Sequence, residues 1–531
     1  MRFRRASPNA PAQPPRSLTT RLLPTALAGA LSVFSFAPFG WWPLQIASLA
    51  VLFYQMLRGA SVKSGFFIGW AYGFGWVCAG TWWLYVSLHN FGEMAAPLAG
   101  AAVVLLALGM GLYVALAMAA AAWLRRRWLL SLPAMNLIVL PLCWGLSEWV
   151  RGWLFTGFPW IVSGYAHTAS PLAGYAPLLG VYGLGWLAAL AAGALLLLVH
   201  RTRKVALAVL VLLFGAGFGL EQVVWTHPEG KPISVRLVQG NVPQQEKFSR
   251  EFLAGALAAY QADIMAKPAD LIATPETAFP MLPQQLPPGY LEQLGKFAVS
   301  SHSHLLLGMP LADSATAYYN STMGIPPVAG SSYYRYDKHH LVPFGEFIPP
   351  GFHWFVDLVA IPLGDMTRGA VVQPAFSVGQ QRVLPNICYE DLFGEEIAEQ
   401  LATPAAGQQP ATILLNISNL AWFGDTIAIP QHLQISQMRT LETGRPMLRA
   451  TNTGATAIIS SRGVVVGLLP TDSHGTLAAD VQGFSGMTPY ILLGNKLFLA
   501  LSALLLAGTI LLARKKNGQL PEESQAAVKT R

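Results

Sequence analysis

The stretch VLPNICYED occupies residues 383–391, and a run with helical spacing follows from Glu395. A short apolar strand therefore ends at Cys388, just before the first turn of a helix. Backbone N–H groups and the helix dipole at such a position favour the thiolate, which is the nucleophilic form of cysteine. The stretch predicts an α/β domain with a reactive cysteine at a strand end, although Cys388 alone could also be a buried core thiol.

Two more segments place a charged residue at or just after the end of an apolar run. Residues 270–276 read DLIATPE, in which Pro275 sets a turn before Glu276, and residues 336–346 read YDKHHLVPFGE and contain Lys338. Taken singly, Glu276 could be a solvent contact at a strand end, and Lys338 a surface residue in a charged turn. The occurrence of all three in this order predicts that Glu276, Lys338 and Cys388 line one cleft.

Segment 222–490 alternates short runs rich in β-branched residues with helix-like stretches that have a polar face. Strands that alternate with helices are typical of an α/β domain, and the segment is long enough to bury its own core. The expected strands are 233–238, 271–274, 304–309, 411–417 and the run 447–459, and the expected helices are 250–266, 290–300 and 430–442.

The composition places much of the chain in a membrane. Hydrophobic residues make up 53% of it and charged residues 11%, with a mean hydropathy of +0.43, whereas soluble domains carry about 25% charged residues. A helix needs about 20 apolar residues to cross a bilayer. The predicted fold class is a polytopic α-helical membrane domain of about eight transmembrane helices joined to the α/β domain. The eight segments are 20–38, 43–57, 64–88, 95–123, 134–153, 175–199, 204–221 and 491–513.

The start of the chain allows two other interpretations. The first two apolar segments are short and flank the sequence PFG at 38–40, so they could form a re-entrant pair instead of two spans. Arg2, Arg4 and Arg5 precede an apolar stretch with small residues at 28–30, which is the pattern of a cleaved signal peptide. We disfavour the signal peptide, because cleavage there would leave a protein that begins inside a continuing apolar pattern.

Basic clusters between the apolar segments predict the orientation, because cytoplasmic loops of membrane proteins are rich in Lys and Arg. Every second connection is basic, so both termini are expected in the cytoplasm and segment 222–490 outside. The net charge of +8 is then a topology signal and does not indicate nucleic-acid binding. Arg151, near an external connection, is the one exception. The clusters are Arg16 with Arg21, Arg58 with Lys63, residues 125–127, Arg201 with Arg203 and Lys204, and residues 514–516.

The expected organisation is a tail at 1–19, transmembrane helices at 20–221, the external domain at 222–490, a last helix at 491–513 and a tail at 514–531. The tails are rich in Pro, Arg, Gln and Glu and are expected to be disordered. Cys78 and Cys143 lie in apolar segments and are expected to be packing residues, so no disulfide is predicted. Nothing in the sequence points to a metal or an organic cofactor.

Glu276, Lys338 and Cys388 resemble the Glu-Lys-Cys triad of the nitrilase superfamily, whose fold is a four-layer α-β-β-α sandwich. Further motifs, together with the eight apolar segments, narrow the resemblance to the apolipoprotein N-acyltransferase family over nearly the whole chain apart from the tails. These motifs are QGNVPQ at 239–244, KHHLVPFGE at 338–346, CYE at 388–390, AWFGD at 421–425 and RPMLRATN at 445–452.

Two positions depart from the pattern of that family. The family often has a Trp shortly after the Gln-Gly-Asn segment, where the nearest aromatic residue in this chain is Phe248, and an Asp where this chain has Leu420. Neither position belongs to the triad. The departures therefore concern the contacts with lipid and leave the expected reaction class unchanged.

The resemblance implies transfer of an acyl chain from a phospholipid, with phosphatidylethanolamine as the expected donor, to the α-amino group of the S-diacylglyceryl cysteine of an apolipoprotein. It implies Cys388 as the nucleophile that carries the chain as a thioester, Glu276 as the general base and Lys338 as the cation that stabilises the oxyanion. It also implies a multi-pass protein of the bacterial inner membrane with a periplasmic catalytic domain. The implied supporting or pocket residues are Glu346, which would orient Lys338 or the base, and Phe344, Tyr389, Glu390, Asn419, Trp422 and Phe423.

Segment 349–366 is too apolar for a free external loop. We expect it to enter the outer leaflet or to cover the site, and the alternative is an ordinary buried segment. Its apolar residues are Phe352, Trp354, Phe355, Val356, Leu358, Ile361 and Leu363.

Two rival functions remain open from the sequence. A membrane-tethered amidase or nitrilase would pass the acyl group to water with the same triad, although eight spans exceed the single anchor that a soluble substrate would need. A transporter or channel with an external binding domain would carry ionisable residues inside its spans. Here such residues are few, and Glu93 and Glu148 lie near the ends of the apolar segments.

Overall fold

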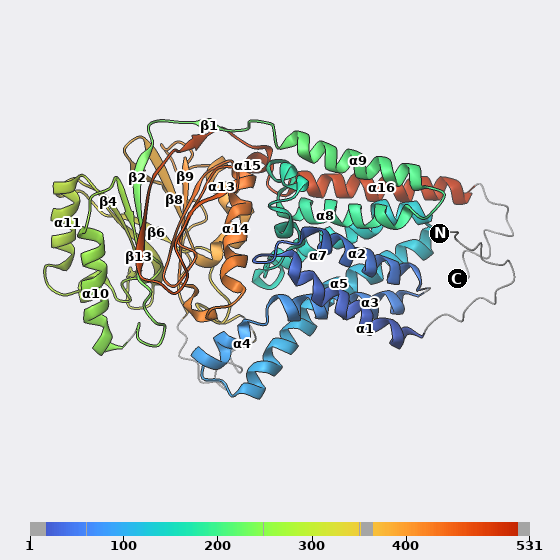
Figure 1. The fold of residues 1–531 in the computed structure, drawn as a ribbon, viewed down its shortest axis with the longest axis horizontal. Coiled ribbons are helices and arrows are strands. Elements are labelled where there is room, and N and C mark those ends of the chain that lie inside the picture. Colours follow the sequence, from blue (N-terminus) through green and yellow to red (C-terminus); the bar gives the residue numbers. More distant parts are fainter. Residues whose placement is uncertain (1–16, 60, 248, 350, 352–364, 519–531) are drawn as a thin grey trace, which may run out of the picture.

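The computed structural model describes residues 17–59, 61–247, 249–349, 351 and 365–518 of the 531-residue chain. The chain folds into a bundle of helices and a β-sandwich that lies on one end of the bundle (Figure 1). Phe248, most of the apolar segment 349–366 with Trp354 and Phe355, and most of both tails lie outside the described residues. The covering role expected of segment 349–366 therefore stays a prediction.

Two six-stranded sheets face each other in the sandwich. Apolar side chains from both sheets, such as Leu237 and Leu306 on one and Ile387 and Leu415 on the other, form the core between them. The first sheet has the order β13-β2-β3-β4-β5-β6 and the second β12-β11-β10-β9-β8-β7. The strands are β2 (Ile233–Gln239), β3 (Leu271–Ala273), β4 (His304–Ala312), β5 (Tyr318–Ile325), β6 (Tyr334–Asp337), β7 (Phe376–Val378), β8 (Gln381–Ile387), β9 (Ile413–Ser418), β10 (Met447–Thr451), β11 (Ala457–Ile459), β12 (Val465–Leu468) and β13 (Gly475–Val481).

Helices cover the outer face of each sheet. α10 (Arg250–Met265) and α11 (Tyr290–Ser301) pack on the first sheet, with Leu257 and Leu294 in the contact. α13 (Gly394–Ala402) and α14 (Ala428–Thr443) cover the second sheet and lie between it and the bundle (Figure 1). These layers confirm the predicted α-β-β-α sandwich. The expected strands and helices appear close to their predicted bounds, and the run 447–459 forms the antiparallel pair β10 and β11.

The beginning and the end of the sandwich segment in the sequence lie side by side in the structure. β13 pairs with β2 in antiparallel register, from Gly475 opposite Gln239 to Val481 opposite Ile233. β1 (His227–Pro228) and β14 (Phe484–Ser485) continue as a short two-stranded ribbon. This ribbon leads to α9 (Arg203–Leu220) on one side and to α16 (Lys496–Gly518) on the other. The sandwich is therefore an insertion between two helices that both pack against α8 (Ala176–Leu197).

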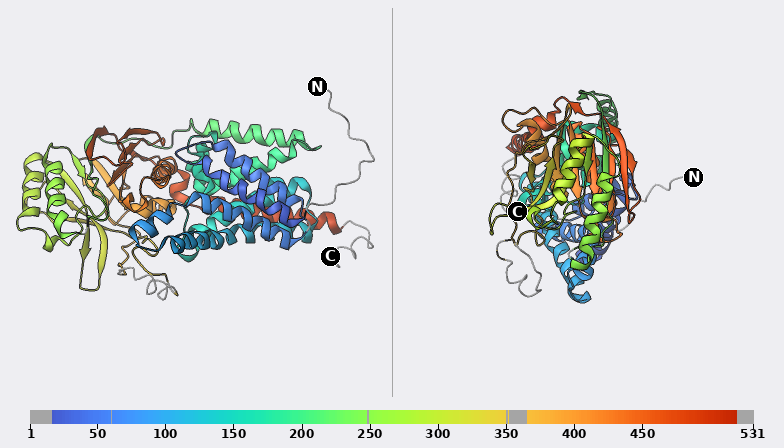
Figure 2. Two further views of the ribbon diagram at one scale, coloured as in Figure 1. Left: turned by 60° about the horizontal axis from the view of Figure 1, so that its bottom comes forward. Right: turned by 90° about the vertical axis from the view of Figure 1, so that its left-hand side faces the viewer.

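Helices that overlap the eight predicted apolar segments run side by side in the bundle (Figures 1 and 2). Among the described residues, four helices are long and apolar enough to cross a membrane, namely α5, α8 with the turn before it, α9 and α16, and α2 is apolar but shorter. A membrane domain fits these helices, and the count of eight spans stays a prediction. The remaining bounds are α1 (Leu18–Leu31), α2 (Trp42–Leu57), α3 (Val62–Gly80), α5 (Ala96–Trp128) and α7 (Leu140–Trp153).

Several of the expected segments are not continuous helices. Segment 20–38 ends as α1 at Leu31 and passes into a short 3₁₀ turn, Ser32–Ser35, and Gly180 kinks segment 175–199. Segment 64–88 stops as α3 at Gly80, and the chain turns at Thr81 before the short helix α4 (Leu84–Val86) and a π-helical turn at Ser87–Phe91. Segment 491–513 divides at Gly494, whose φ of +53° is readily adopted only by glycine. The short helix α15 (Pro489–Leu493) ends there, and the last long helix begins at Lys496 instead of residue 491.

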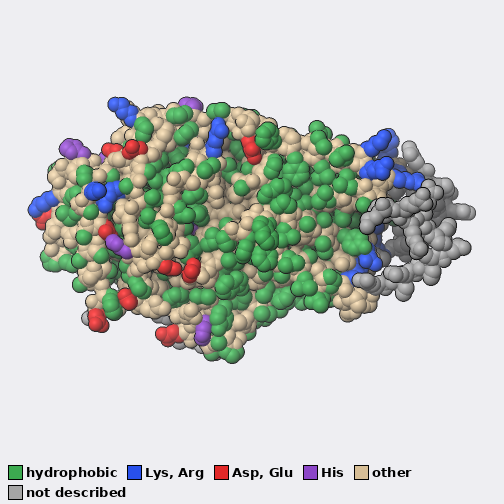
Figure 3. All heavy atoms as spheres, viewed as in Figure 1, with side chains coloured by type: hydrophobic (Ala, Val, Ile, Leu, Met, Phe, Trp, Pro, Cys, Tyr) green, Lys and Arg blue, Asp and Glu red, His purple; other side chains and the backbone are tan. Residues whose placement is uncertain are grey.

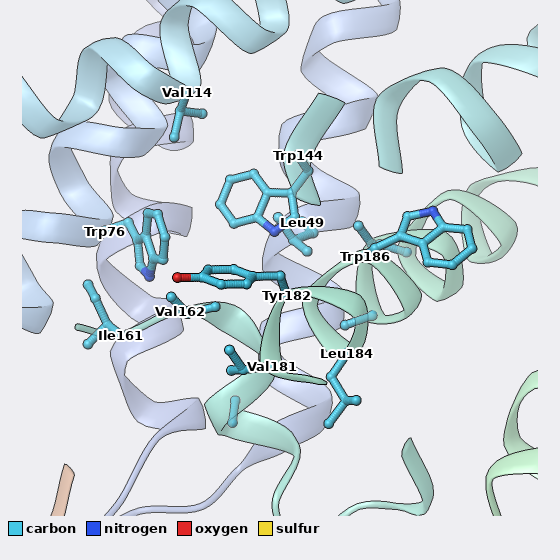
Figure 4. Packing of buried hydrophobic residues seen from close by; sticks show 14 of the residues in the cluster. Leu49, Trp76, Val114, Trp144, Ile161, Val162, Val181, Tyr182, Leu184 and Trp186 are labelled. Atoms are coloured by element: carbon cyan, nitrogen blue, oxygen red, sulfur yellow. The ribbon is translucent and has the colours of Figure 1, made fainter. Parts of the chain in front are cut away.

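Close helix contacts and large aromatic side chains fill the centre of the bundle. A Cβ on Gly73 of α3 would lie 2.8 Å from the Cα of Gly111 on α5, so the small residues allow the two backbones to meet. The ring centroids of Trp76 and Trp144 are 5.1 Å apart, and Tyr182 extends toward Trp76 (Figure 4). These rings belong to one buried hydrophobic core that joins the helices.

Lys and Arg side chains gather at the end of the bundle away from the sandwich, and a broad apolar surface lies between that end and the sandwich (Figure 3). Arg58 and Arg125, from two of the predicted basic clusters, line the same cavity there. The guanidinium of Arg514 lies over the ring of Trp128 at 4.6 Å. The basic connections of the sequence thus meet at one end of the molecule.

Arg151 does not belong to this group. It is buried and donates hydrogen bonds to the carbonyl oxygens of Phe158 (2.5 Å) and Trp160 (3.0 Å). Its guanidinium also lies over the ring of Trp76 at 4.9 Å. Arg151 therefore holds an internal loop, and it is no exception to the pattern of surface charge.

Candidate active site

The structure brings Glu276, Lys338 and Cys388 together at strand ends of the sandwich. Glu276 follows β3, Lys338 follows β6 and Cys388 follows β8. The Nζ atom of Lys338 lies 3.3 Å from Oε1 of Glu276, and the thiol of Cys388 lies close enough to both groups for their charges to shift its pKa. Strand ends that are far apart in the sequence thus place a carboxylate, a cation and a thiol within reach of one another.

Lys338 is enclosed between two carboxylates and is only 1% exposed. Its ammonium group lies 2.9 Å from the carboxylate of Glu346, in addition to its contact with Glu276. Asn320, on β5, donates to both Glu276 (2.8 Å) and Glu346 (2.7 Å). Burial alone would lower the pKa of Lys338, but the two carboxylates outweigh burial and raise that pKa above its ordinary value. Lys338 is therefore a fixed cation.

Glu276 is held in its ionised form. Besides Lys338 and Asn320, the backbone N–H of Asn419 donates to its Oε2 atom at 2.9 Å. Burial would raise the pKa of Glu276, but the charge of Lys338 and these hydrogen bonds outweigh burial and lower that pKa below its usual range. Lys247 donates to the Glu276 carbonyl at 3.1 Å, and burial lowers the pKa of Lys247 to about 8. Glu276 is thus a carboxylate at neutral pH, as a general base must be.

Cys388 stands at a strained turn between β8 and a five-residue 3₁₀ helix, Cys388–Leu392. Its φ of +53° lies in the left-handed region, which costs a residue with a side chain about 1–3 kcal/mol. Burial raises the pKa of its thiol, the charge of Glu276 raises it further, and Lys338 offsets only part of the increase. The site therefore favours the protonated thiol, in keeping with the expectation that Glu276 removes the proton during attack. The short helical turn does not outweigh desolvation and the adjacent carboxylate, so a base must remove the proton.

The backbone of Cys388 is held by side chains that sequence reasoning missed. His432 places Nε2 3.3 Å from the Cys388 carbonyl oxygen and Nδ1 2.8 Å from a guanidinium nitrogen of Arg449. Because Arg449 can only donate, Nδ1 accepts and Nε2 carries the proton that points at the carbonyl. Asn416 donates to the same carbonyl at 3.4 Å. A polar Asn416 within an otherwise apolar strand was the one signal in the sequence that could have indicated this support.

Glu390 connects the Lys338 and Cys388 segments. Its carboxylate accepts hydrogen bonds from the backbone N–H groups of residues 339 (2.6 Å) and 340 (3.3 Å), from the N–H of Ile387 (2.6 Å) and from the hydroxyl of Tyr336 (3.1 Å). Burial raises the pKa of Glu390 to about 7. These contacts tie the two loops together, so Glu390 is a positioning residue for the triad.

Known proteins match both parts of the chain. Residues 28–194 match the family described as apolipoprotein N-acyltransferase N-terminal domain, and residues 234–489 match the carbon-nitrogen hydrolase family. The chain is 50% identical to the apolipoprotein N-acyltransferase of Ralstonia nicotianae over 496 residues, which cover 92% of this chain and 93% of that relative. The chain belongs to the apolipoprotein N-acyltransferase family. A further member, from Bordetella bronchiseptica, is 43% identical over 94% of this chain and 97% of its own length.

The aromatic motif that this chain shares with the apolipoprotein N-acyltransferase family, at 421–425, lies where the sandwich meets the bundle. Trp422 is 40% exposed, and its ring centroid lies 6.0 Å from that of Phe91. Phe423 packs deeper, with its ring centroid 4.4 Å from that of Trp83 and 6.1 Å from that of Trp160. The two neighbours thus differ, because Phe423 joins the two parts of the molecule and Trp422 presents its ring at the surface.

The other residues implied by the family resemblance have different contacts, and only Asn419 bonds directly to a member of the triad. The side chain of Asn419 donates to Gln244 at 2.8 Å, which aligns its backbone N–H on Glu276. Tyr389 is buried and donates its hydroxyl to the carbonyl of Gly157 at 2.9 Å, so it anchors the sandwich on the bundle. Phe344 is half-buried in the loop after Lys338 and has a φ of +60°.

The departure from the family pattern at Leu420 has a structural explanation. Leu420 has no exposed surface and packs with Ile429 and Ala455 in an apolar cluster that also contacts Cys388 and Phe423. A carboxylate at this position would lose its water without gaining a charged partner from the cluster. A leucine is therefore the better fit to these neighbours.

Replacing Leu420 by aspartate is expected to destabilise the protein by about 2–4 kcal/mol, because the new charge would be buried among apolar side chains. The change is measured as a lower thermal unfolding midpoint of the detergent-purified protein. Leu420→Met, which conserves volume, is the matched control and should lower stability by less than about 1.5 kcal/mol. Equal unfolding midpoints for the two variants would contradict this account of the cluster.

Proposed function

We propose that the chain transfers an acyl chain from a phospholipid, through a thioester on Cys388, to the α-amino group of the N-terminal S-diacylglyceryl cysteine of apolipoproteins. The position of the nucleophile carries the proposal. Cys388 lies beside Glu276 and Lys338, and Leu392 and Phe393, which follow it, belong to the same hydrophobic core as the bundle helices. A triad at this junction suits substrates that keep their own chains in a bilayer.

In the first half-reaction, Glu276 takes the proton of the Cys388 thiol while the sulfur attacks the ester carbonyl carbon of the phospholipid. Lys338 stabilises the oxyanion of the tetrahedral intermediate, and single donors of this kind contribute about 3–4 kcal/mol. The C–O bond then breaks, and Glu276 gives its proton to the departing alcohol. A lysophospholipid leaves, and the acyl chain stays on Cys388 as a thioester.

In the second half-reaction, the α-amino group of the acceptor attacks the thioester carbonyl carbon. Glu276 accepts a proton from the attacking amine, and Lys338 again faces the oxyanion. The C–S bond breaks, the proton passes from Glu276 to the sulfur, and the product leaves as an amide. Because an amide is more stable than a thioester, the transfer is downhill and requires no nucleotide.

We infer that the sandwich is periplasmic in the bacterial inner membrane and that both termini are cytoplasmic. The gathering of Lys and Arg at the opposite end of the bundle supports this orientation (Figure 3). Eight spans, seven within 20–221 and one within 491–513, fit the helices, with tails at 1–19 and 514–531 and the sandwich at 222–490. Phosphatidylethanolamine is the proposed donor.

The proposal is tested by intact-mass analysis of the purified protein after incubation with phosphatidylethanolamine of defined chain length. We expect a mass increase of one acyl chain that hydroxylamine removes. A diacylglyceryl peptide should then discharge the adduct rapidly and appear as the N-acylated product. A folded protein that never forms the adduct would refute the proposed function.

A membrane-bound amidase with water as the acceptor is the second candidate, since the triad supports either acceptor. The family membership and the large apolar bundle favour the transferase. The same experiment separates the two, because an adduct that water discharges as rapidly as the peptide does would identify a hydrolase.

The ionisation of Glu276 and of the Cys388 thiol is expected to add little pH dependence to the rate of adduct formation between about pH 5.5 and pH 8. The lowered pKa of Glu276 keeps the base ionised, so the acid limb lies below the ordinary carboxyl pKa of about 4.3. The raised pKa of the Cys388 thiol keeps it protonated, so its ionisation adds no rise within this window. Single-turnover acylation at several pH values measures this. A rate that climbs about tenfold per pH unit would show that free thiolate is the attacking species.

A further inference from the structure

The loop that follows β2, residues 240–247, is bound to both sheets of the sandwich. The backbone N–H of Asn241 donates to the carbonyl of Asn452, just after β10, at 2.8 Å. The side chain of Asn452 donates back to the loop at 2.7 Å and to the side chain of Asn419 at 3.1 Å. Since the N–H of Asn419 holds the carboxylate of Glu276, these bonds join the loop to the base.

Lys247, at the end of this loop, holds the backbone of the base. Its Nζ atom donates to the carbonyl oxygen of Glu276 at 3.1 Å and to the hydroxyl of Thr277 at 2.6 Å. Lys247 is only 5% exposed, so these hydrogen bonds form away from competing water. Asn419 and Lys338 thus hold the carboxylate of Glu276, and Lys247 holds the peptide unit that carries it.

The turn that Lys247 holds is strained. Thr277 has a φ of +46°, in the left-handed region that β-branched residues rarely adopt. The backbone of β4 lies close behind the turn, because a Cβ on Gly308 would come within 2.0 Å of the Pro275 carbonyl oxygen. Such a conformation persists only where its surroundings determine it. The bond from Lys247 to the strained residue is therefore part of what aims Glu276 at Cys388.

The charge of Lys247 also reaches the triad. Burial lowers the pKa of Lys247 to about 8, and the charges of Glu276 and Cys388 oppose that decrease, so Lys247 is mainly a cation at neutral pH. Burial raises the pKa of Glu276, and the charge of Lys247 adds to that of Lys338 in lowering it. A neutral donor could make the same two hydrogen bonds at a smaller cost of desolvation. The charge itself is therefore useful to the site.

We propose that Lys247 is a positioning residue for the reaction, which fixes the turn at Glu276 and Thr277 and supplies a second positive charge that keeps the base ionised. This inference rests on the proposed function, because it takes Glu276 as the general base. Lys247 acts through Glu276 and exchanges no proton or bond with the substrate. Its role thus differs from that of Lys338, which faces the oxyanion.

Two reactions of the full-length protein test the proposal, namely single-turnover acylation by phosphatidylethanolamine and alkylation of Cys388 by iodoacetamide, followed by peptide mass. Lys247→Met, which is neutral and of similar length, should slow both by roughly ten- to hundredfold at neutral pH. The loss should be larger at about pH 5 than at about pH 8, because a base without this cation binds a proton more readily. Lys247→Arg keeps the charge, so it should retain most of the rate and lose the same fraction at both pH values.

Lys267→Met is the matched control, since Lys267 is an exposed lysine of the same domain and its rates should equal those of wild type. Wild-type rates in Lys247→Met would overturn the proposal. So would equal losses in the Met and Arg variants that do not depend on pH, since these would indicate packing alone.

Thr277→Val removes one acceptor of the ammonium group and leaves its charge in place. It should slow both reactions by the same factor at both pH values, and wild-type rates in this variant would overturn the positioning role even if Lys247→Met fails to fold. Alkylation uses the same base and requires no lipid. A wild-type protein that is alkylated but never acylated would therefore contradict the proposed function, while the alkylation rates would still decide the role of Lys247.

Discussion

Replacing Cys388 by alanine is expected to abolish the acyl adduct and to slow acyl transfer by at least about 10⁴-fold. The thiol lies beside Glu276, and in the proposed reaction its sulfur is the atom that carries the acyl chain. Without it, Glu276 and Lys338 could still polarise an ester, but no thioester would form and the two half-reactions could not be separated. Intact mass and the yield of N-acylated peptide measure the two effects.

Cys78 and Cys143 provide the matched controls for this variant. Both thiols lie in the helical bundle, and alanine at either position should leave the adduct intact. Alanine at 388 has the same left-handed backbone to adopt as cysteine, so the unfolding midpoint should stay close to that of wild type. An adduct that persists in Cys388→Ala but vanishes in Cys78→Ala or Cys143→Ala would contradict the assignment of the nucleophile.

Glu276→Gln is expected to slow adduct formation by roughly 10³-fold while the thiol remains in place. Burial and the neighbouring carboxylate keep the Cys388 thiol protonated, so the reaction depends on a base. The amide that replaces Glu276 cannot accept that proton. Removing the negative charge of Glu276 also lowers the pKa of the Cys388 thiol. The rate of adduct formation in Glu276→Gln should therefore increase as the pH rises, whereas the wild-type rate should change little with pH. Single-turnover acylation against pH measures both features.

Glu346→Gln separates the role of the base from that of a charge partner. Glu346 contacts the same ammonium group and the same Asn320 as Glu276 does, so each variant leaves Lys338 with one carboxylate. We expect Glu346→Gln to lose roughly ten- to hundredfold in rate and to keep the flat pH profile, because Glu276 is still present. If the rate of adduct formation instead rose with pH in Glu346→Gln and did not change with pH in Glu276→Gln, Glu346 would be the base and Glu276 the charge partner.

The triad was predictable because each member belongs to a local pattern, an apolar strand that stops at or near a functional residue. Glu276, Lys338 and Cys388 could therefore be named without knowledge of how the strands pair. Asn320 and His432 could not, because their roles depend on contacts distant in sequence. Asn320 reaches Glu276 and Glu346 only because β5 lies between β4 and β6, and His432 reaches Cys388 only because α14 covers the second sheet. No local pattern marks either residue.

The protonation state of Cys388 shows another limit of local patterns. The strand-to-helix position was expected to favour a thiolate, but the helix that follows is a single five-residue turn and the thiol lies beside a carboxylate in a desolvated site. Burial is a property of the folded chain, and spacing along the sequence does not report it. The breaks at Thr81 and Gly494 were missed for a related reason, since apolar composition continues through both.

The insertion of the sandwich between α9 and α16 determines the order in which the bundle can be completed. Phe498 of α16 is fully buried, and its ring lies 6.1 Å from that of Trp186 on α8. The ribosome makes α8 before residues 221–495 and α16 after them, and at about 5–20 residues per second that interval lasts tens of seconds. Until α16 arrives, the face of α8 around Trp186 lacks its final neighbour. Nascent chains stalled within the sandwich should therefore expose that face to membrane chaperones, whereas chains released after α16 should not.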